Sequence, residues 1–172
     1  MKAFAINFVL STIVVSMTVA LVGCSGTSQS KTTEVSALQA FGGILEASDS
    51  FEGGAKRAAQ EGGPVALAEF AIKNGDILSA AVIPLNEALI ADPTSGGFPE
   101  PALIQTLAIA ADAYGSTLID LSTRLSACPT GDEVCYEVAY EADSGAGTAA
   151  RDQFRAAVVA VNTVASQSVQ GQ

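Results

Sequence analysis

The stretch from residue 104 to residue 125 constrains the fold of this chain more than any other. Its apolar side chains recur at alternating intervals of three and four residues, which places them on one narrow face of an α-helix. Asp112, Asp120 and Arg124 lie off that face. We therefore predict a long amphipathic helix that packs against other helices along these residues: Ile104, Leu107, Ala111, Tyr114, Leu118, Leu121 and Leu125.

Two segments before it show the same period. The first begins near Thr33 and Glu34, and the second begins at Pro64, which suits the first turn of a helix. We expect Pro84 to kink the second segment, because proline removes a backbone hydrogen bond from a helix interior. The apolar positions of the first segment are Phe41, Ile44, Phe51, Ala55 and Ala58, and those of the second are Leu67, Ala71, Leu78, Ala81 and Leu85.

A fourth helical segment starts at about Asp132. Its apolar residues include Val134 and Val138 early and Phe154, Val158 and Val161 late. The glycine-containing run 143–147 lies between them, and we expect a bend or a break there because glycine is a poor helix former.

The four segments together predict the fold class. No stretch alternates with period two among β-branched residues, so strands are not expected. Glycine and proline cluster at 62–64 and 92–99, which fits short turns between antiparallel neighbours. We predict an all-α, up-down four-helix bundle over residues 34–168. Acidic residues four positions before basic ones should support its helices, at Glu52 with Lys56, Glu69 with Lys73, and Asp120 with Arg124.

The N-terminus carries a different signal. Lys2 precedes an apolar run from Ala3 to Val22, and the tetrapeptide Leu21-Val22-Gly23-Cys24 closes that run. This tetrapeptide resembles the lipobox of bacterial lipoproteins. The resemblance implies that residues 1–23 are a signal peptide that is removed, that Cys24 is acylated, and that several acyl chains anchor the protein in a membrane. The alternative is a retained membrane anchor, since the run is long enough to span a bilayer.

Residues 24–33 connect the expected anchor to the helical domain. After Cys24 they are small and polar, with no apolar period, and we interpret them as a flexible tether. A coil of nine residues reaches roughly 15 to 18 Å. The domain should therefore lie close to the membrane, either on the outer face of the cytoplasmic membrane or on the periplasmic side of an outer membrane.

With Cys24 assigned to lipid by the resemblance, Cys128 and Cys135 remain. We predict that they bond to each other, because exported proteins fold in an oxidising compartment. The bond would give a disulfide-clamped hairpin between the third and fourth helices. A redox-active pair is a weaker alternative, because the two cysteines lack the spacing of a CxxC motif.

The charge of the chain limits its partners. The formal net charge is −10, and such a surface repels nucleic acid. Glu133, Glu137 and Glu141 recur every four residues and should share one helix face. We interpret them either as a solvated acidic face or as a face that binds a cation or a basic partner.

The chain contains no histidine, which removes most common catalytic sites. Neither a Gly-x-Ser-x-Gly nor a Ser-x-x-Lys motif is present. We therefore expect no enzyme activity, no metal and no cofactor. A hydrolase that uses paired carboxylates is the enzymatic alternative.

Three tyrosines are the remaining candidate site residues. Tyr114 lies in the third apolar face, while Tyr136 and Tyr140 share a face of the fourth segment, opposite the glutamates. Core packing is one interpretation of them. The other is an aromatic cleft between the third and fourth helices that stacks a ligand.

The sequence thus predicts a membrane-anchored envelope lipoprotein that is not an enzyme. We expect it to bind another envelope component or to act as an accessory subunit. The main alternative is a small-molecule carrier with an apolar cleft between its helices, which requires an underfilled core. No nucleic acid partner is expected.

Overall fold

The structure is a computed structural model that describes residues 36–95 and 98–170. The chain divides into two units, Met1–Thr32 and Thr33–Gln172, and every described residue belongs to the second. The expected signal peptide, Cys24, the tether and the start of a helix near Thr33 lie outside the described residues.

The described residues form helices and no strands. The helices are α1 (Ala37–Asn74), α2 (Ile77–Ala91), α3 (Pro101–Ser126) and α4 (Glu133–Gln170). The prediction of an all-α fold is therefore confirmed. The four predicted segments do not correspond one to one with these helices, because α1 contains the first predicted segment and the beginning of the second.

A capping box fixes the start of α1. The Ser36 hydroxyl accepts a hydrogen bond from the backbone N–H of Gln39 at 3.2 Å, and the Gln39 side chain accepts one from the Ser36 N–H at 3.1 Å. These two bonds satisfy backbone donors that the first helical turn leaves without a partner. The helix therefore begins at a defined residue.

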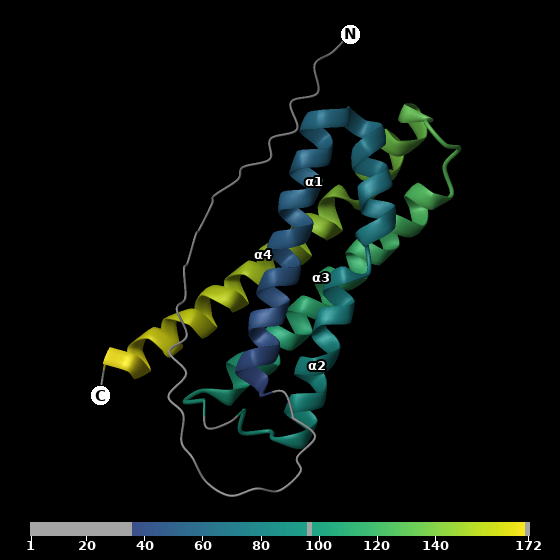
Figure 1. The fold of residues 1–172 in the computed structure, drawn as a ribbon. Helices are drawn as coiled ribbons and strands as arrows, with labels where there is room; N and C mark the ends of the chain where they lie inside the picture. Colours follow the sequence, from purple (N-terminus) through teal and green to yellow (C-terminus); the bar gives the residue numbers. More distant parts are fainter. Residues whose placement is uncertain (1–35, 96–97, 171–172) are drawn as a thin grey trace, which may run out of the picture. The chain divides into compact units, whose positions relative to one another are not determined.

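α1 reverses direction at a single residue, so it consists of two limbs, 37–62 and 64–74 (Figure 1). Gly63 adopts φ 66° and ψ −153°, which only glycine adopts readily, and Pro64 starts the second limb. The limbs pack through Phe51 and Phe70, whose ring centroids are 5.5 Å apart. Gly54 allows this contact, because a Cβ atom there would overlap the Phe70 ring.

The second predicted segment is interrupted at Gly75, between α1 and α2. The side chain of Ser122 in α3 donates to the Ile72 carbonyl at 3.2 Å, which satisfies an acceptor at the end of α1. A Cβ atom at Gly75 would lie 2.6 Å from the Ser122 Cβ, so α3 approaches the chain closely here. By contrast, α2 continues through Pro84. The second predicted segment is therefore divided between α1 and α2, because contacts with α3 determine where the interruption lies, and the kink expected at Pro84 stays a prediction.

α3 contacts α1, α2 and α4, and its contact with α4 is the most extensive between two helices, whereas α2 and α4 do not contact each other. Its predicted apolar face is confirmed, since six of the seven positions are buried and Leu121 is partly buried. Among the described helices, α3 is the one long and apolar enough to cross a membrane by length and composition. Its apolar face instead forms much of the core, together with Phe41, Ile44, Leu78, Leu85, Phe98 and Phe154.

α4 runs from Glu133 to Gln170 without a break. Neither Gly145 nor Gly147 adopts a positive φ, so the glycine-containing run stays helical. The expected break is therefore absent. Phe154 and Val161 are buried against the rest of the core and hold the later part of α4 in place.

We predict that Gly115→Ala destabilises the protein by about 1 to 3 kcal/mol, the range for overpacking a core. A Cβ atom there would overlap the Ser79 hydroxyl and lie 3.0 Å from the Ser79 backbone nitrogen, so α2 and α3 must move apart. Urea unfolding followed by circular dichroism measures the change. Gly53→Ala is the control, because a Cβ atom at Gly53 meets nothing within 4 Å. Equal stability of the two variants would contradict the close contact.

Candidate functional site

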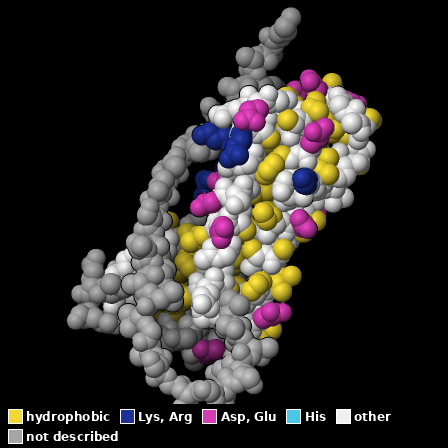
Figure 2. Space-filling model, in the orientation of Figure 1, with side chains coloured by type: hydrophobic (Ala, Val, Ile, Leu, Met, Phe, Trp, Pro, Cys, Tyr) yellow, Lys and Arg dark blue, Asp and Glu magenta, His cyan; other side chains and the backbone are white. Residues whose placement is uncertain are grey.

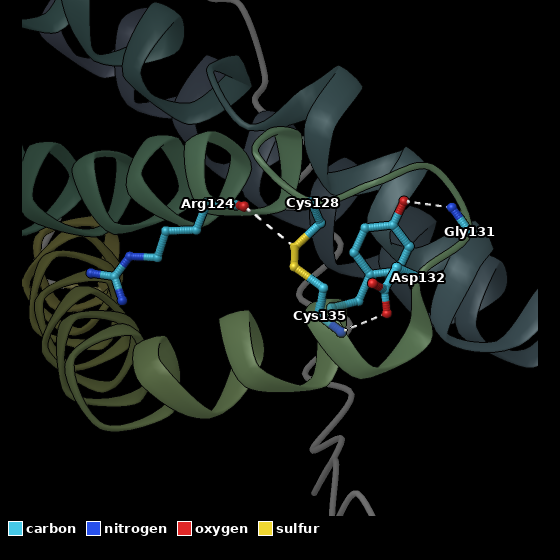
Figure 3. The surroundings of a disulfide bond; sticks show 6 residues. Arg124, Cys128, Gly131, Asp132 and Cys135 are labelled. Carbon is cyan, nitrogen blue, oxygen red and sulfur yellow. Dashed lines mark hydrogen bonds between the residues drawn. A yellow bond between two sulfur atoms is a disulfide. The ribbon is translucent and has the colours of Figure 1, made fainter.

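The hairpin between α3 and α4 contains the predicted disulfide bond (Figure 3). Cys128 and Cys135 are bonded, with their Cα atoms 5.7 Å apart. The Asp132 carboxylate accepts a hydrogen bond from the Cys135 N–H at 3.1 Å, which caps the start of α4. The predicted pairing and its position at this hairpin are confirmed.

A tyrosine also holds the hairpin. The Tyr136 hydroxyl accepts a hydrogen bond from the Gly131 N–H at 3.2 Å, and Gly131 has a φ of 79° that favours glycine. Closing so short a loop with a disulfide stabilises the fold by about 2 to 3 kcal/mol in the chain-entropy treatment. The Asp132 cap, the Tyr136 hydroxyl and the disulfide all hold the same connection between α3 and α4. This arrangement suits a structural role for the disulfide.

Tyr136 and Tyr140 lie at this end of the molecule. Tyr136 is buried in a small cluster, and Tyr140 packs against that cluster. The Tyr140 hydroxyl is buried with no hydrogen-bond partner, and burial raises its pKa above the ordinary value, with Tyr136 adding to the effect. The cluster joins the second limb of α1 to α3 and α4, through Ala68, Ala71, Leu125, Tyr136 and Ala139.

Tyr114 belongs to a different cluster. It is buried in the main core, with its ring centroid 5.8 Å from that of Phe154. Burial raises its pKa, and the nearby negative charge of Glu52 raises it further. The structure therefore places Tyr114 apart from the cluster that contains Tyr136 and Tyr140, and does not gather all three into one buried group.

Glu133, Glu137 and Glu141 are exposed on α4, as their spacing predicts. Val134 and Val138 lie beside them and are also exposed, at 71% and 61%. Within residues 36–95 and 98–170, no three His, Cys, Asp or Glu side chains are grouped in a way that could hold a metal ion. What this face offers a partner is therefore negative charge next to apolar surface.

Glu52 and Arg155 form an ion pair that sequence reasoning did not find. The Arg155 guanidinium donates to the Glu52 carboxylate at 2.6 Å, and the two side chains are 37% and 19% exposed. The pair joins the first limb of α1 to α4, two helices that share few other contacts. Local spacing instead suggested Lys56 as the partner of Glu52, and no local pattern connects residues that are 103 positions apart.

Asp143 is the acidic residue whose environment most disfavours its charge. It is partly buried on α4, and burial raises the pKa of its carboxyl group. Asp120 raises this pKa further, whereas Arg124 lowers it. The charged carboxylate is therefore less stable in the folded protein than in the unfolded chain.

We predict a favourable coupling energy of about 1 kcal/mol between Glu52 and Arg155, because both side chains are partly shielded from water. The test is a double-mutant cycle of Glu52→Gln and Arg155→Gln, measured by urea unfolding. Glu61→Gln, at an exposed residue of α1, is the control and should change stability by less than about 0.5 kcal/mol. Additive effects of the two changes would show that the pair contributes nothing.

We predict that Asp143→Asn stabilises the protein at pH 7. Because the folded-state pKa lies above the ordinary value of 3.8, the cost of the charge is present at neutral pH and disappears as the pH falls below 3.8. The increase in melting temperature should therefore be large at pH 7 and small near pH 3. Asp49→Asn, at an exposed residue, controls for the change in net charge. A lower melting temperature for Asp143→Asn at pH 7 would exclude this account.

Three comparisons with known proteins complete the description of the site. Neither the protein-family models, nor the curated proteins, nor the solved structures contain a match to this chain. Its functional interpretation therefore depends on its own residues.

Proposed function

We propose that this protein is a lipid-anchored, non-enzymatic component of a bacterial cell envelope that binds another envelope protein. One observation carries the proposal: an apolar run ends in a tetrapeptide that resembles a lipobox, and a short polar segment joins Cys24 to the helical domain. The bond between Cys128 and Cys135 supports it, because disulfides persist in oxidising compartments outside the cytoplasm.

We further propose that the domain is an up-down four-helix bundle. Its antiparallel elements are the first limb of α1, the second limb continued by α2, then α3, and then α4. The turn at Gly63 reverses the chain, whereas the interruption at Gly75 lets the second limb and α2 run in the same direction (Figure 1). Helices that are consecutive in this arrangement are joined by short connections, which is typical of up-down bundles.

Close packing at glycines favours a binding role on the outer surface over transport of a ligand in an internal cleft. The Phe70 ring covers Gly54, and Ser79 covers Gly115. At both positions the space that a small residue leaves is filled by a neighbouring helix. A carrier requires unfilled space between its helices.

The distribution of charge indicates a basic partner. Lys and Arg are absent from residues 74–123, a stretch that includes Asp76, Glu87 and Asp112. On the face in Figure 2, the basic side chains lie in the half that contains the turn of α1, and the charged side chains of the other half are acidic. Positively charged proteins are the partners that such a surface attracts.

We predict that the mature protein begins at acylated Cys24 and that Cys24→Ser prevents both cleavage and acylation. The measurement is a non-denaturing mass spectrum of the full chain, extracted from its own membrane in mild detergent, followed by a spectrum of the same sample after denaturation. The wild-type mass should lack residues 1–23 and include acyl chains, whereas Cys24→Ser should keep its N-terminus and carry no lipid. Chemical cross-linking in intact membranes, followed by identification of the linked protein, tests the partner.

Two outcomes would contradict this function. An uncleaved wild-type chain without lipid would exclude the anchor. Small-molecule mass that is lost on denaturation, with no protein recovered by cross-linking, would favour a carrier. Cys128→Ser is a useful control, because it alters a cysteine outside the tetrapeptide and should leave acylation unchanged.

A further inference from the structure

The side of α4 that faces away from the core carries small and apolar residues. All of these residues are exposed, and the side chains of Val134, Val138 and Val159 are 71%, 61% and 54% exposed. Their spacing of mostly three or four residues places them on one face, opposite buried Phe154 and Val161. We call this set the outer stripe: Val134, Val138, Ala142, Gly145, Ala149, Ala156, Val159 and Thr163.

Glycine at position 145 is unexplained by the fold of a single chain. It is helical, it has no positive φ, and a Cβ atom there would meet nothing within 4 Å. Alanine would be more favourable in a helix interior by about 1 kcal/mol. Gly115 differs, because Ser79 occupies the space beside it. Gly42, Gly43 and Gly53 are equally open, but at Gly145 the open position lies on the outer stripe, where glycine permits close approach of a second backbone.

Two acidic and two basic residues along one edge of the outer stripe lie at equal distances from residue 146, whereas Glu133 on that edge has no basic counterpart. Glu137 and Glu141 precede this point, and Arg151 and Arg155 follow it, on the same edge of the helix. In an antiparallel pair of identical helices, like edges meet. A register centred on residue 146 therefore brings Glu137 of one copy opposite Arg155 of the other, and Glu141 opposite Arg151.

The same register matches the apolar residues. Val134 of one copy comes within about one residue of a position opposite Val159 of the other, and Val138 within about two residues of a position opposite Ala156, while Ala142, Gly145 and Ala149 lie near the crossing. The guanidinium of Arg155 already donates to Glu52, but it has five N–H donors and can accept a second carboxylate as a partner. Asp152 is the one charged residue in line with the stripe. Its Oδ1 atom lies 3.7 Å from the Nε atom of Arg151, so its charge has a nearby basic partner.

We propose that the outer stripe is the contact surface of an antiparallel, two-fold symmetric dimer of this chain, with α4 crossing its copy at Gly145. The complementarity of charge in one register, along an exposed apolar stripe, identifies the second copy as the occupant. The proposal concerns α4 alone, so it stands whether or not Cys24 carries lipid.

The test compares Gly145→Glu with the wild-type protein. The full chain is extracted from its own membrane in mild detergent and measured by non-denaturing mass spectrometry over a range of concentrations. The wild type should show the mass of a dimer, and Gly145→Glu should show only the monomer. Its helical circular dichroism should remain, because the added side chain points into open space in the monomer. Gly53→Glu is the matched control, with an equally open position on α1.

A cysteine one residue from the symmetry axis provides a second measurement in intact membranes. Gly145→Cys should form a disulfide-linked dimer on mild oxidation, because the two copies of this residue lie next to each other. Gln153→Cys, exposed on α4 but beside the stripe, should form little more than the wild type.

Three results would overturn the proposal. The wild type could be a monomer at every concentration, or Gly53→Glu could abolish the dimer as fully as Gly145→Glu does. A different protein, bound to the stripe of a monomeric chain and lost in Gly145→Glu, would equally replace the second copy as the occupant. Loss of acylation in any of these samples bears on the anchor and not on the dimer, so the two proposals fail separately.

Discussion

Close contact between helix backbones at small residues is the constraint on which the rest of this structure depends. α3 lies against α2 where Gly115 meets Ser79, and against the end of α1 where Ser122 meets Gly75. These contacts set a short distance between the helix axes. The core between the helices is accordingly rich in alanine. Larger side chains at these points would separate the helices and leave the remaining core residues without partners.

Regular spacing made much of the fold predictable. The apolar face of α3 follows from a period that only a helix satisfies, and the Cys128–Cys135 bond follows from two nearby cysteines at a turn. Both inferences use residues close in sequence. The exposure of Glu133, Glu137 and Glu141 follows in the same way from one helix face.

Features that depend on residues far apart could not be predicted. The interruption at Gly75 depends on close contact with Ser122 of another helix. The helix stays continuous at Gly145 because packing of α4 on α3 outweighs a propensity cost of about 1 kcal/mol. The candidate site showed the same limit: spacing indicated which tyrosines share a face, but the separation of Tyr114 from the others arises in three dimensions.

The single-residue turn at Gly63 has a consequence for how the domain assembles. Because the two limbs of α1 are adjacent in sequence, their contacts form after closure of a very short loop, and the hairpin of α3 and α4 is similarly local. Only the limited contact between α1 and α4 joins the two ends of the domain. The chain therefore has a low contact order, and it should fold quickly, from two local hairpins, with little time spent exposing apolar surface.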